Sequence, residues 1–296
     1  MTLATTADLV ASAAAEDTAV LAFNVITIEH AEGIADGVER AGVAALMQVS
    51  ENTVRFHGGR IAPLVSACAH IAARSSASLA VHLDHFQDVT LITEAVDTAA
   101  ELGVTSIMID AAHLSYRDNV DRTRSLVRNA HEAGLWVEAE LGEIGGKGDA
   151  HVLGARTDPD EAAAFAEETG VDGLAVAVGS SHAMTTRDAR LDVELIHELA
   201  ARVAIPLVLH GSSGVPDGQL RLAVHAGIRK LNVGTALNVE YTGAIRRFLS
   251  ADAGVTDPRK YLTAGRRAIG DTVVDLCRAI ASPSQVAVNV GQRDPR

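Results

Sequence analysis

The sequence predicts an α/β fold, a closed (β/α)8 TIM barrel followed by a C-terminal helical extension. Short β-branched or Leu-rich runs alternate with longer Ala-rich amphipathic runs, and eight such pairs follow one another. The 296 residues are enough for a barrel, which typically needs roughly 250. No Gly-x-Gly-x-x-Gly follows the first strand, so an open dinucleotide-binding sheet is not favoured.

The eight strands are expected at residues 20–25, 44–49, 79–83, 106–109, 136–139, 173–178, 206–209 and 230–233. Helical patterns follow them, for example at residues 91–102, 119–133, 159–169 and 193–203. A glycine often stands just before the next strand, at Gly42, Gly103, Gly134, Gly170 and Gly227. Glycine is common at this place because the residue that ends a helix adopts a left-handed backbone conformation.

The chain is expected to form a single domain over residues 1–296, with the barrel at about 18–250 and the extension at about 251–296. Within the extension, residues 257–260 are expected to form a loop and residues 261–280 a helix. The tail at 282–296 holds two prolines and several polar residues, so we expect a loose end.

Composition limits the partners that this protein binds. It has 38 Asp and Glu against 25 Lys and Arg, which argues against nucleic acid and against anionic membranes. A small anionic substrate remains compatible, because backbone amides or one Arg can bind a phosphate. Cys68 and Cys277 have no CxxC spacing and are expected to be buried free thiols. Without a signal-peptide pattern or a long apolar run, we expect a cytoplasmic, soluble protein.

Polar residues stand at the C-terminal end of every predicted strand, where barrel enzymes place their chemistry. In chain order they are Asn24, Gln48 with Ser50, Asp84 with His85, Asp110, Glu140, Ser180 and Ser181 leading to His182, His210, and Asn232. Eight polar strand ends in succession are hard to attribute to the solvation of loops alone.

Three of these residues are histidines from different strand ends. His85, His182 and His210 are therefore predicted to bind one metal ion, since three protein ligands and an open position form a catalytic zinc site. Asp110 and Glu140 are predicted to support these ligands or to bind a metal in an alternative position. The other interpretation is that these two carboxylates cap the following helices.

Asp84 directly precedes His85. Successive side chains of a strand point to opposite sides, so both can reach one site only if the chain turns there. Asp84 would then lie beside a metal-bound substrate without being a ligand, which suits general acid/base catalysis.

Two Gly-rich turns follow the last two strands. They are Gly211-Ser212-Ser213-Gly214 and Asn232-Val233-Gly234-Thr235. Barrel enzymes often bind phosphate at this position, and small residues let backbone amides approach an anion.

The sequence resembles the class II fructose- and tagatose-bisphosphate aldolases over nearly its whole length. The stretches that carry the resemblance are AFNV at 22–25, HLDH at 82–85, SIMIDAAH at 106–113, VEAELG at 137–142, VDGLAVAVGSSH at 171–182, PLVLHGSSG at 206–214, KLNVGTAL at 230–237 and DPRKY at 257–261. The resemblance implies reversible, zinc-dependent cleavage of a fructose or tagatose 1,6-bisphosphate into dihydroxyacetone phosphate and glyceraldehyde 3-phosphate.

The resemblance also implies roles for individual residues. His85, His182 and His210 would bind Zn²⁺, and Asp84 would donate and accept the proton. Arg259 would reach the second phosphate across a subunit interface. The other implied substrate-binding residues are Asn24, Ser50, Ala183, Gly211, Ser212, Ser213, Asn232, Val233, Gly234 and Thr235. Family members are usually dimers or tetramers and often use a monovalent cation, Na⁺ or K⁺, near the phosphate.

Two stretches depart from the family pattern. Ala183 stands where a Gly usually follows the second zinc histidine. The loop after the fifth strand reads Gly-Gly-Lys-Gly-Asp at 145–149 and lacks the usual glutamate, for which Asp149 or Glu143 are the available substitutes.

Other functions fit the sequence less well. A Schiff-base aldolase needs a lysine, and of Lys147, Lys230 and Lys260 only Lys230 lies in a predicted strand, where alternation predicts a buried, ion-paired side chain. A zinc hydrolase barrel usually has His-x-His at strand one and Asp at strand eight, where this chain has Asn24 and Asn232. A related phosphorylated ketose or deoxy-ketonate as substrate, and a non-catalytic sugar-phosphate-binding homologue, remain as alternatives.

Overall fold

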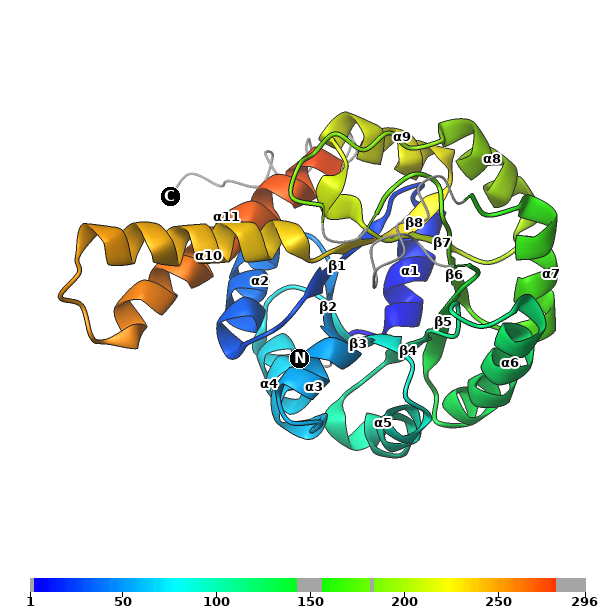
Figure 1. Ribbon diagram of the computed structural model, residues 1–296, viewed down its shortest axis with the longest axis horizontal. Coiled ribbons are helices and arrows are strands. Elements are labelled where there is room, and N and C mark those ends of the chain that lie inside the picture. The colour runs from blue at the N-terminus through cyan, green and yellow to red at the C-terminus, as the bar shows by residue number, and fades with distance from the viewer. Residues whose placement is uncertain (1–2, 143–155, 182–183, 281–296) are drawn as a thin grey trace, which may run out of the picture.

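The computed structural model describes residues 3–142, 156–181 and 184–280, and these form a closed barrel of eight parallel strands. Each strand pairs with the next, and β1 pairs with β8 to close the ring (Figure 1). The strands are β1 Val20–Asn24, β2 Ala45–Ser50, β3 Leu79–Phe86, β4 Ser106–Ile109, β5 Trp136–Glu140, β6 Gly173–Ala175, β7 Leu207–Leu209 and β8 Ile228–Val233. The predicted fold class is thus confirmed.

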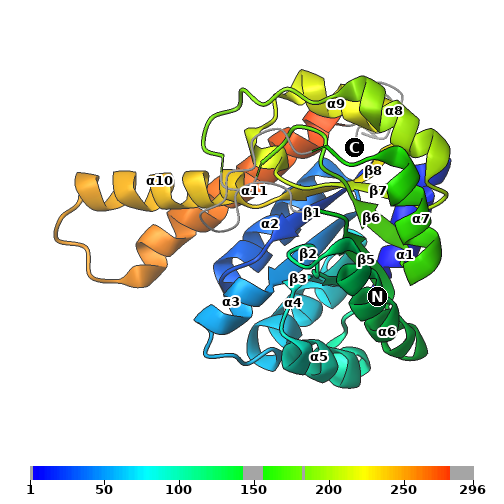
Figure 2. The ribbon, with the colours of Figure 1, turned by 45° about the vertical axis from the view of Figure 1, so that its right-hand side comes forward.

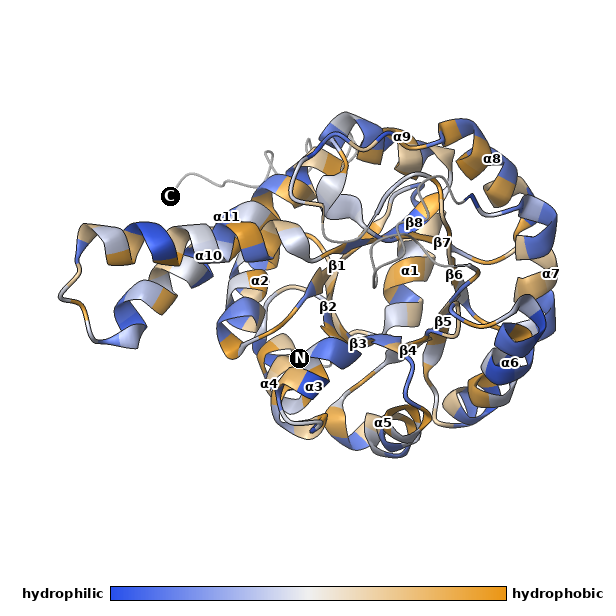
Figure 3. Cartoon of the chain, in the orientation of Figure 1, coloured by the Kyte–Doolittle hydropathy of each residue, from blue (hydrophilic) through white to orange (hydrophobic). Residues whose placement is uncertain are grey.

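Helices surround the ring of strands. They are α2 Ile28–Ala41, α3 Glu51–Phe56, α4 Ala62–Arg74, α5 Val89–Leu102, α6 Tyr116–Glu132, α7 Pro159–Thr169, α8 Val193–Arg202 and α9 Asp217–Ala226, with a short 3-10 turn, η1, at Ser212–Gly214. The helix after β8, α10 Thr235–Ala251, instead runs outward from the barrel (Figure 1). Hydrophobic and hydrophilic segments alternate along these helices (Figure 3). One large apolar core forms between the strands and the helices, while a second, smaller one fills the barrel interior.

Sequence patterns located most element boundaries within two residues. All five glycines predicted to end helices have positive φ, from 68° at Gly42 to 129° at Gly227. Two strand ends differ from the prediction by three residues. β3 continues to Phe86, and β6 stops at Ala175 because the Ala177 backbone N–H turns to the Thr157 hydroxyl.

An N-terminal helix, α1 Thr6–Ala15, was not predicted. Thr5 caps it by accepting a hydrogen bond from Asp8 N–H, and Val10 and Ala13 pack into the barrel-interior core. The helix is visible through the ring of strands in Figure 1, so it covers one opening of the barrel. Since the predicted polar strand ends lie at the other opening, α1 leaves them accessible.

The C-terminal extension is a helical arm. Helix α11, Pro258–Ile280, runs beside α10, and the two helices project from the side of the barrel in both views (Figures 1 and 2). The predicted loop at 257–260 is wrong, because helix α11 already begins at Pro258, with the Arg259 backbone N–H donating to the Asp257 carboxylate. Proline suits the first turn of a helix, where its missing N–H costs nothing.

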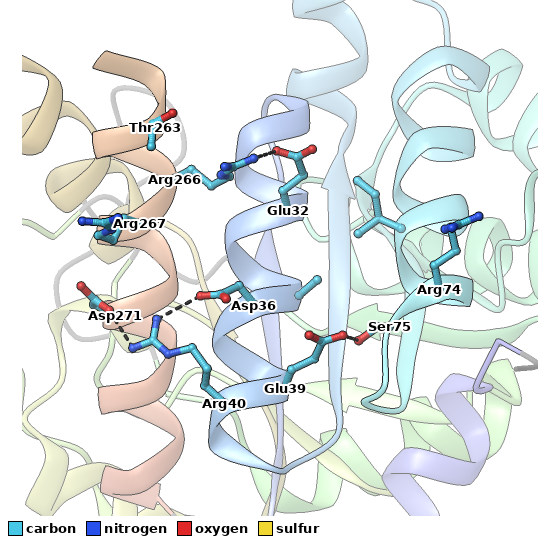
Figure 4. Close-up of a pocket in the computed structure, with 12 residues that line it drawn as sticks. Glu32, Asp36, Glu39, Arg40, Arg74, Ser75, Thr263, Arg266, Arg267 and Asp271 are labelled. Atoms are coloured by element: carbon cyan, nitrogen blue, oxygen red, sulfur yellow. Dashed lines mark hydrogen bonds and ion pairs between the residues drawn. The ribbon is translucent and has the colours of Figure 1, made fainter. Parts of the chain in front are cut away.

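Glycines let α11 pack closely on α2. A Cβ atom on Gly37 would lie 2.6 Å from Val273 Cβ and 2.7 Å from the Gly270 carbonyl oxygen. Salt bridges at the edge of this contact join Arg266 to Glu32 and Arg40 to Asp271 (Figure 4). The arm is therefore held to the barrel over much of its length.

Replacing Gly37 with alanine is expected to destabilise the protein by about 1–3 kcal/mol, because the added methyl group forces α11 away from α2. Gly218→Ala in α9 is the control, since its nearest neighbouring atom would lie 3.9 Å away. We expect the control to be neutral or stabilising by about 0.5–1 kcal/mol. Urea denaturation of both variants measures this, and equal free energies of unfolding would contradict close packing at Gly37.

No helix among the described residues is long and apolar enough to cross a membrane.

Candidate active site

A cleft of about 510 Å³ opens at the C-terminal ends of the strands. Most of the predicted site residues line it: Asn24, Ser50, Asp84, His85, His210, Gly211, Ser213, Asn232, Gly234 and Thr235. A larger groove of about 710 Å³ lies between α2, α4 and α11 (Figure 4), but its charged wall residues are largely paired with one another. Reactive groups therefore converge in the cleft at the strand ends.

A turn near the end of β3 brings Asp84 and His85 to the same side. Pairing between β3 and β4 shifts register between Leu83 and Phe86, and His85 has φ +54°. Such a bulge re-aims side chains that would otherwise alternate. The turn that the adjacent Asp84 and His85 require is thus present, inside the strand rather than after it.

The imidazole rings of His85 and His210 lie in contact, nearly perpendicular to each other, with their centroids 4.6 Å apart. His85 Nε2 lies 2.9 Å from His210 Nδ1. The outer nitrogen of each ring lies near a buried carboxylate: His85 Nδ1 is 3.0 Å from Asp110 Oδ2, and His210 Nε2 is 2.7 Å from Glu138 Oε1. If both outer nitrogens donate to these carboxylates, both facing nitrogens present lone pairs, which a bound cation would stabilise.

Among the described residues, two sets of side chains could hold a metal ion, and they share His85. Ligand atoms of Asp84, His85 and His210 lie within 4.8 Å of one another, and so do those of His85, Asp110 and Glu140. Neutral imidazole and carboxylate are suitable ligands for Zn²⁺, so the residues present fit the metal that the sequence predicts. The second set matches the predicted alternative position.

Asp110 and Glu140 do not cap the following helices. Ser115 caps α6 and Asp158 caps α7, so the capping interpretation of the two carboxylates is wrong. Asp110 instead faces His85, and the Glu140 carboxylate lies 4.0 Å from His85 Nδ1.

A buried ion pair between Lys230 and Glu138 lies deeper in the barrel than His85 and His210 and contacts Asn232 and His210. Lys230 Nζ donates to Glu138 Oε2 at 2.8 Å and to Asn232 Oδ1 at 2.7 Å. The prediction that Lys230 is buried and ion-paired is confirmed. Burial raises the pKa of Glu138, but Lys230 and His210 outweigh this and hold the pKa below its usual range. Glu138 is therefore a carboxylate that accepts from both sides.

Two asparagine amides flank Asp84. Asn24 Nδ2 lies 3.5 Å from one carboxylate oxygen and Asn232 Nδ2 lies 3.4 Å from the other. The Gln48 amide donates to Asn24 Oδ1, as Lys230 does to Asn232, so both asparagines turn their NH₂ groups towards Asp84. Burial raises the pKa of Asp84, but the nearby His85, His210, His82 and Lys230 outweigh this and lower it overall to about 2. The carboxylate is ionised at neutral pH.

Both Gly-rich turns border the cleft. Gly211 has φ +70°, and a Cβ there would lie 2.5 Å from the Ser181 carbonyl oxygen, so the turn admits no larger residue without a shift. Ser213 Oγ accepts from Ala236 N–H in the first turn of α10, which begins directly after Gly234. The positive end of this 17-residue helix thus faces the cleft, as an anion site requires.

Some predicted residues lie elsewhere. The side chains of Ser212 and Val233 are buried and do not line the cleft. Only the backbone of these two residues could contact a ligand. Arg259 lies in the first turn of α11, exposed and paired with Asp257. His182, Ala183 and the loop acids Glu143 and Asp149 fall outside the described residues.

Several site residues were missed by sequence reasoning. Glu138 and His82 lie one layer below Glu140 and Asp84 on the same strands, and alternation from those residues could have identified them. Asn52, Phe56 and Asn238 also line the cleft, but they come from helices α3 and α10, where no sequence signal distinguished them.

Protein stability should decrease as the pH falls from 6.5 towards 3. Burial lowers the pKa of His82 from 6.5 to about 3, so between these values the unfolded chain binds the extra proton. One buried neutral histidine contributes at most about 1.4 kcal/mol per pH unit to the slope of the free energy of unfolding against pH. His82→Asn, which cannot ionise, is expected to reduce that slope for the metal-free protein.

Urea denaturation between pH 4 and pH 7 measures the slope, with replacement of the exposed His70 as the control. An identical slope in His82→Asn and wild type would contradict the assignment.

Comparison with known proteins agrees with the geometry. A model of the family described as fructose-bisphosphate aldolase class-II matches residues 4–285. A fructose-bisphosphate aldolase of Staphylococcus aureus (strain Mu50) is 35% identical over 255 residues, covering 85% of this chain and 87% of that protein. One from Staphylococcus epidermidis is 34% identical over 267 residues, covering 89% and 92%. The crystal structure of the YdjI aldolase from Escherichia coli K12 superimposes with a TM-score of 0.81 at 28% identity, covering 96% of this chain and 99% of that one.

Proposed function

The chain belongs to the class-II fructose-bisphosphate aldolase family and is an aldolase, a carbon–carbon lyase; from this premise we propose that it cleaves a ketose 1,6-bisphosphate reversibly with the help of Zn²⁺. The substrate is fructose or tagatose 1,6-bisphosphate, and the products are dihydroxyacetone phosphate and glyceraldehyde 3-phosphate. The observation that carries the proposal is the convergence of an ionised Asp84 with His85 and His210 in one cleft.

We propose His85, His210 and His182 as the zinc ligands. The facing nitrogens of His85 and His210 support the first two, and His182 enters by family resemblance. Bound zinc would supply Lewis-acid stabilisation of the negative charge that develops beside the broken bond. Asp110 and Glu138 keep the ligand rings in one orientation through their outer nitrogens.

The role proposed for Asp84 is that of the acid/base. During cleavage its carboxylate takes the proton from the C4 hydroxyl, and during condensation it returns that proton. The amides of Asn24 and Asn232 hold the two carboxylate oxygens in place, so little reorganisation is needed at the moment of proton transfer.

One phosphate of the substrate is assigned to the two Gly-rich turns, where the N-terminus of α10 favours an anion. The residues proposed there are Gly211, Ser212, Ser213, Asn232, Val233, Gly234 and Thr235, with a monovalent cation, Na⁺ or K⁺, nearby. Asn24 and Ser50, which also line the cleft, are proposed to contact the carbon chain.

Cleavage assays with zinc-loaded protein test this function. Rates for fructose 1,6-bisphosphate, tagatose 1,6-bisphosphate and a phosphorylated deoxy-ketonate are compared as kcat/KM, with dihydroxyacetone phosphate as the detected product. We expect a ketose bisphosphate to have the highest value. Binding of sugar phosphates with no cleavage of any of the three would favour the non-catalytic alternative.

Arg259 is proposed to bind the second phosphate in a neighbouring subunit of a homodimer or homotetramer. Its side chain is 89% exposed, and the start of α11 lies at the far end of the arm from the barrel (Figure 1). The arm thus holds Arg259 away from its own cleft. A guanidinium matches phosphate with two parallel hydrogen bonds.

Arg259→Ala is expected to raise KM for the bisphosphate by roughly 10- to 100-fold, the loss of one charge-assisted contact. Binding of dihydroxyacetone phosphate should hardly change, because its phosphate lies at the Gly-rich turns. Arg267→Ala, on the same helix and also exposed, is the control. An unchanged KM in Arg259→Ala would remove the residue from the site.

Mixing subunits tests whether Arg259 acts across an interface. Asp84→Ala and Arg259→Ala proteins, each inactive or impaired, should regain activity together because hybrid oligomers contain one site with both residues intact. If the subunits exchange and no activity returns, Arg259 does not act in trans.

A further inference from the structure

The end of β3 departs from regular strand geometry where Asp84 and His85 lie. Pairing with β2 runs as far as Ser50 opposite Asp84, and pairing with β4 changes register just beyond. The left-handed backbone of His85, at φ +54°, costs a non-glycine residue on the order of 1–3 kcal/mol. Such a conformation persists only where the surrounding structure holds it.

Glu51 lies against the backbone directly after this turn. Its Oε2 accepts hydrogen bonds from the backbone N–H groups of Gln87 at 2.7 Å and Asp88 at 2.8 Å. Its other oxygen accepts from the Arg55 guanidinium at 2.8 Å. Glu51 is 6% exposed and is the first residue of α3, directly after β2 ends. The side chain therefore supplies acceptors to the chain just after β3, beyond the last residue that pairs with β2.

A second link joins the same segment to the ring of His85. The side-chain amide of Gln87 donates to Asp110 Oδ2 at 3.2 Å, and this oxygen also lies 3.0 Å from His85 Nδ1. The backbone that Glu51 holds thus carries the amide that helps to orient the carboxylate partner of His85.

We propose that Glu51 is a positioning residue for the active site. Its carboxylate holds the left-handed turn at His85, so that Asp84 and His85 face the cleft together. Glu51 itself does not line the cleft, and it acts only through the backbone of Gln87 and Asp88. The inference rests on the proposed function, since it concerns the proposed base and a proposed zinc ligand.

Glu51→Ala removes both acceptors and should let the turn relax. A displacement of about 1 Å in a reacting group can lower the rate about 100-fold, so kcat is expected to fall by roughly 10- to 100-fold while KM changes little. Loss of a supporting partner typically weakens metal binding by about 10- to 100-fold, which chelator competition measures. Hydrogen exchange of the Gln87 and Asp88 amides should accelerate.

Glu39→Ala is the matched control. The Glu39 carboxylate accepts from Ser75 Oγ at 2.7 Å and from Ser76 N–H at 2.8 Å, in the loop that precedes β3 (Figure 4). It removes the same kind of contact at the other end of the same strand. We expect this variant to lose stability but to keep wild-type zinc affinity and kcat.

The proposal is overturned if Glu51→Ala matches Glu39→Ala in zinc affinity, kcat and exchange at Gln87 and Asp88. If Glu51→Ala does not fold, Glu51→Gln takes its place, because it keeps one acceptor oxygen and should show smaller losses of the same kind. Wild-type values in that variant would also overturn the proposal. Failure of the wild-type protein to bind zinc or to cleave would instead refute the proposed function, while amide exchange still decides whether Glu51 holds the turn.

Discussion

Asp84→Ala is expected to lower kcat by roughly 100- to 10,000-fold, the usual contribution of a positioned acid/base group, while zinc stays bound. The physical reason is that Asp84 is ionised and held by two amides beside the histidines, so its loss removes the proton acceptor. Steady-state cleavage rates and the zinc content of the purified variant measure both effects.

Two further variants make the result specific. Asp84→Asn keeps the shape and one of the two acceptor oxygens but cannot accept the proton, so it should be nearly as inactive as the alanine variant. Asp158→Ala removes a carboxylate that caps α7 and should lose stability only. Near-normal turnover in Asp84→Ala would end the acid/base assignment.

Removing zinc is expected to abolish cleavage, and adding zinc back should restore it. The facing nitrogens of His85 and His210, 2.9 Å apart, are proposed to bind the zinc ion directly. His210→Ala should therefore purify without metal and without activity. His197→Ala, an exposed histidine of α8, is the control that keeps both.

Borohydride trapping separates this mechanism from a Schiff-base aldolase. Lys230 is fully buried and paired with Glu138, so treatment with substrate and borohydride should leave no covalent adduct. An adduct, or full activity after chelation, would overturn the zinc proposal.

Much of the fold could be predicted because its signals are local. The apolar runs of the strands, the Ala-rich helical patterns and the glycines that end helices depend on near neighbours along the chain. The exceptions are equally physical. Helix α1 was missed because its short apolar stripe gains stability only by packing into the barrel opening. The start of α11 was missed because a proline, here at 258, is as common in loops as it is in a helix's first turn, where it also fits.

The sequence predicted the residues of the candidate site that stand at the strand ends, but not those that lie one layer deeper in the barrel. The polar strand ends, Asn24, Asp84, His85, His210 and Asn232, lie together because parallel strands in a closed barrel end at one face. The buried side chains that contact these residues were not identified from the positions of strand ends. Glu138 and His82 are charged or polar residues within strands, and only the structure shows that they accept from His210 or lie beside the Lys230 ion pair.

By itself, the sequence determined the barrel, the chemistry of its strand ends and the membership of the aldolase family, because residue order and type are enough for each. The tertiary structure alone decided how neighbouring side chains share one cleft. The adjacent Asp84 and His85 face it together only because β3 bulges and His85 takes a left-handed backbone. That conformation is unfavourable locally, so no local pattern predicts it. It depends on contacts made by residues far apart in the sequence, such as Glu51 with the backbone of Gln87 and Asp88.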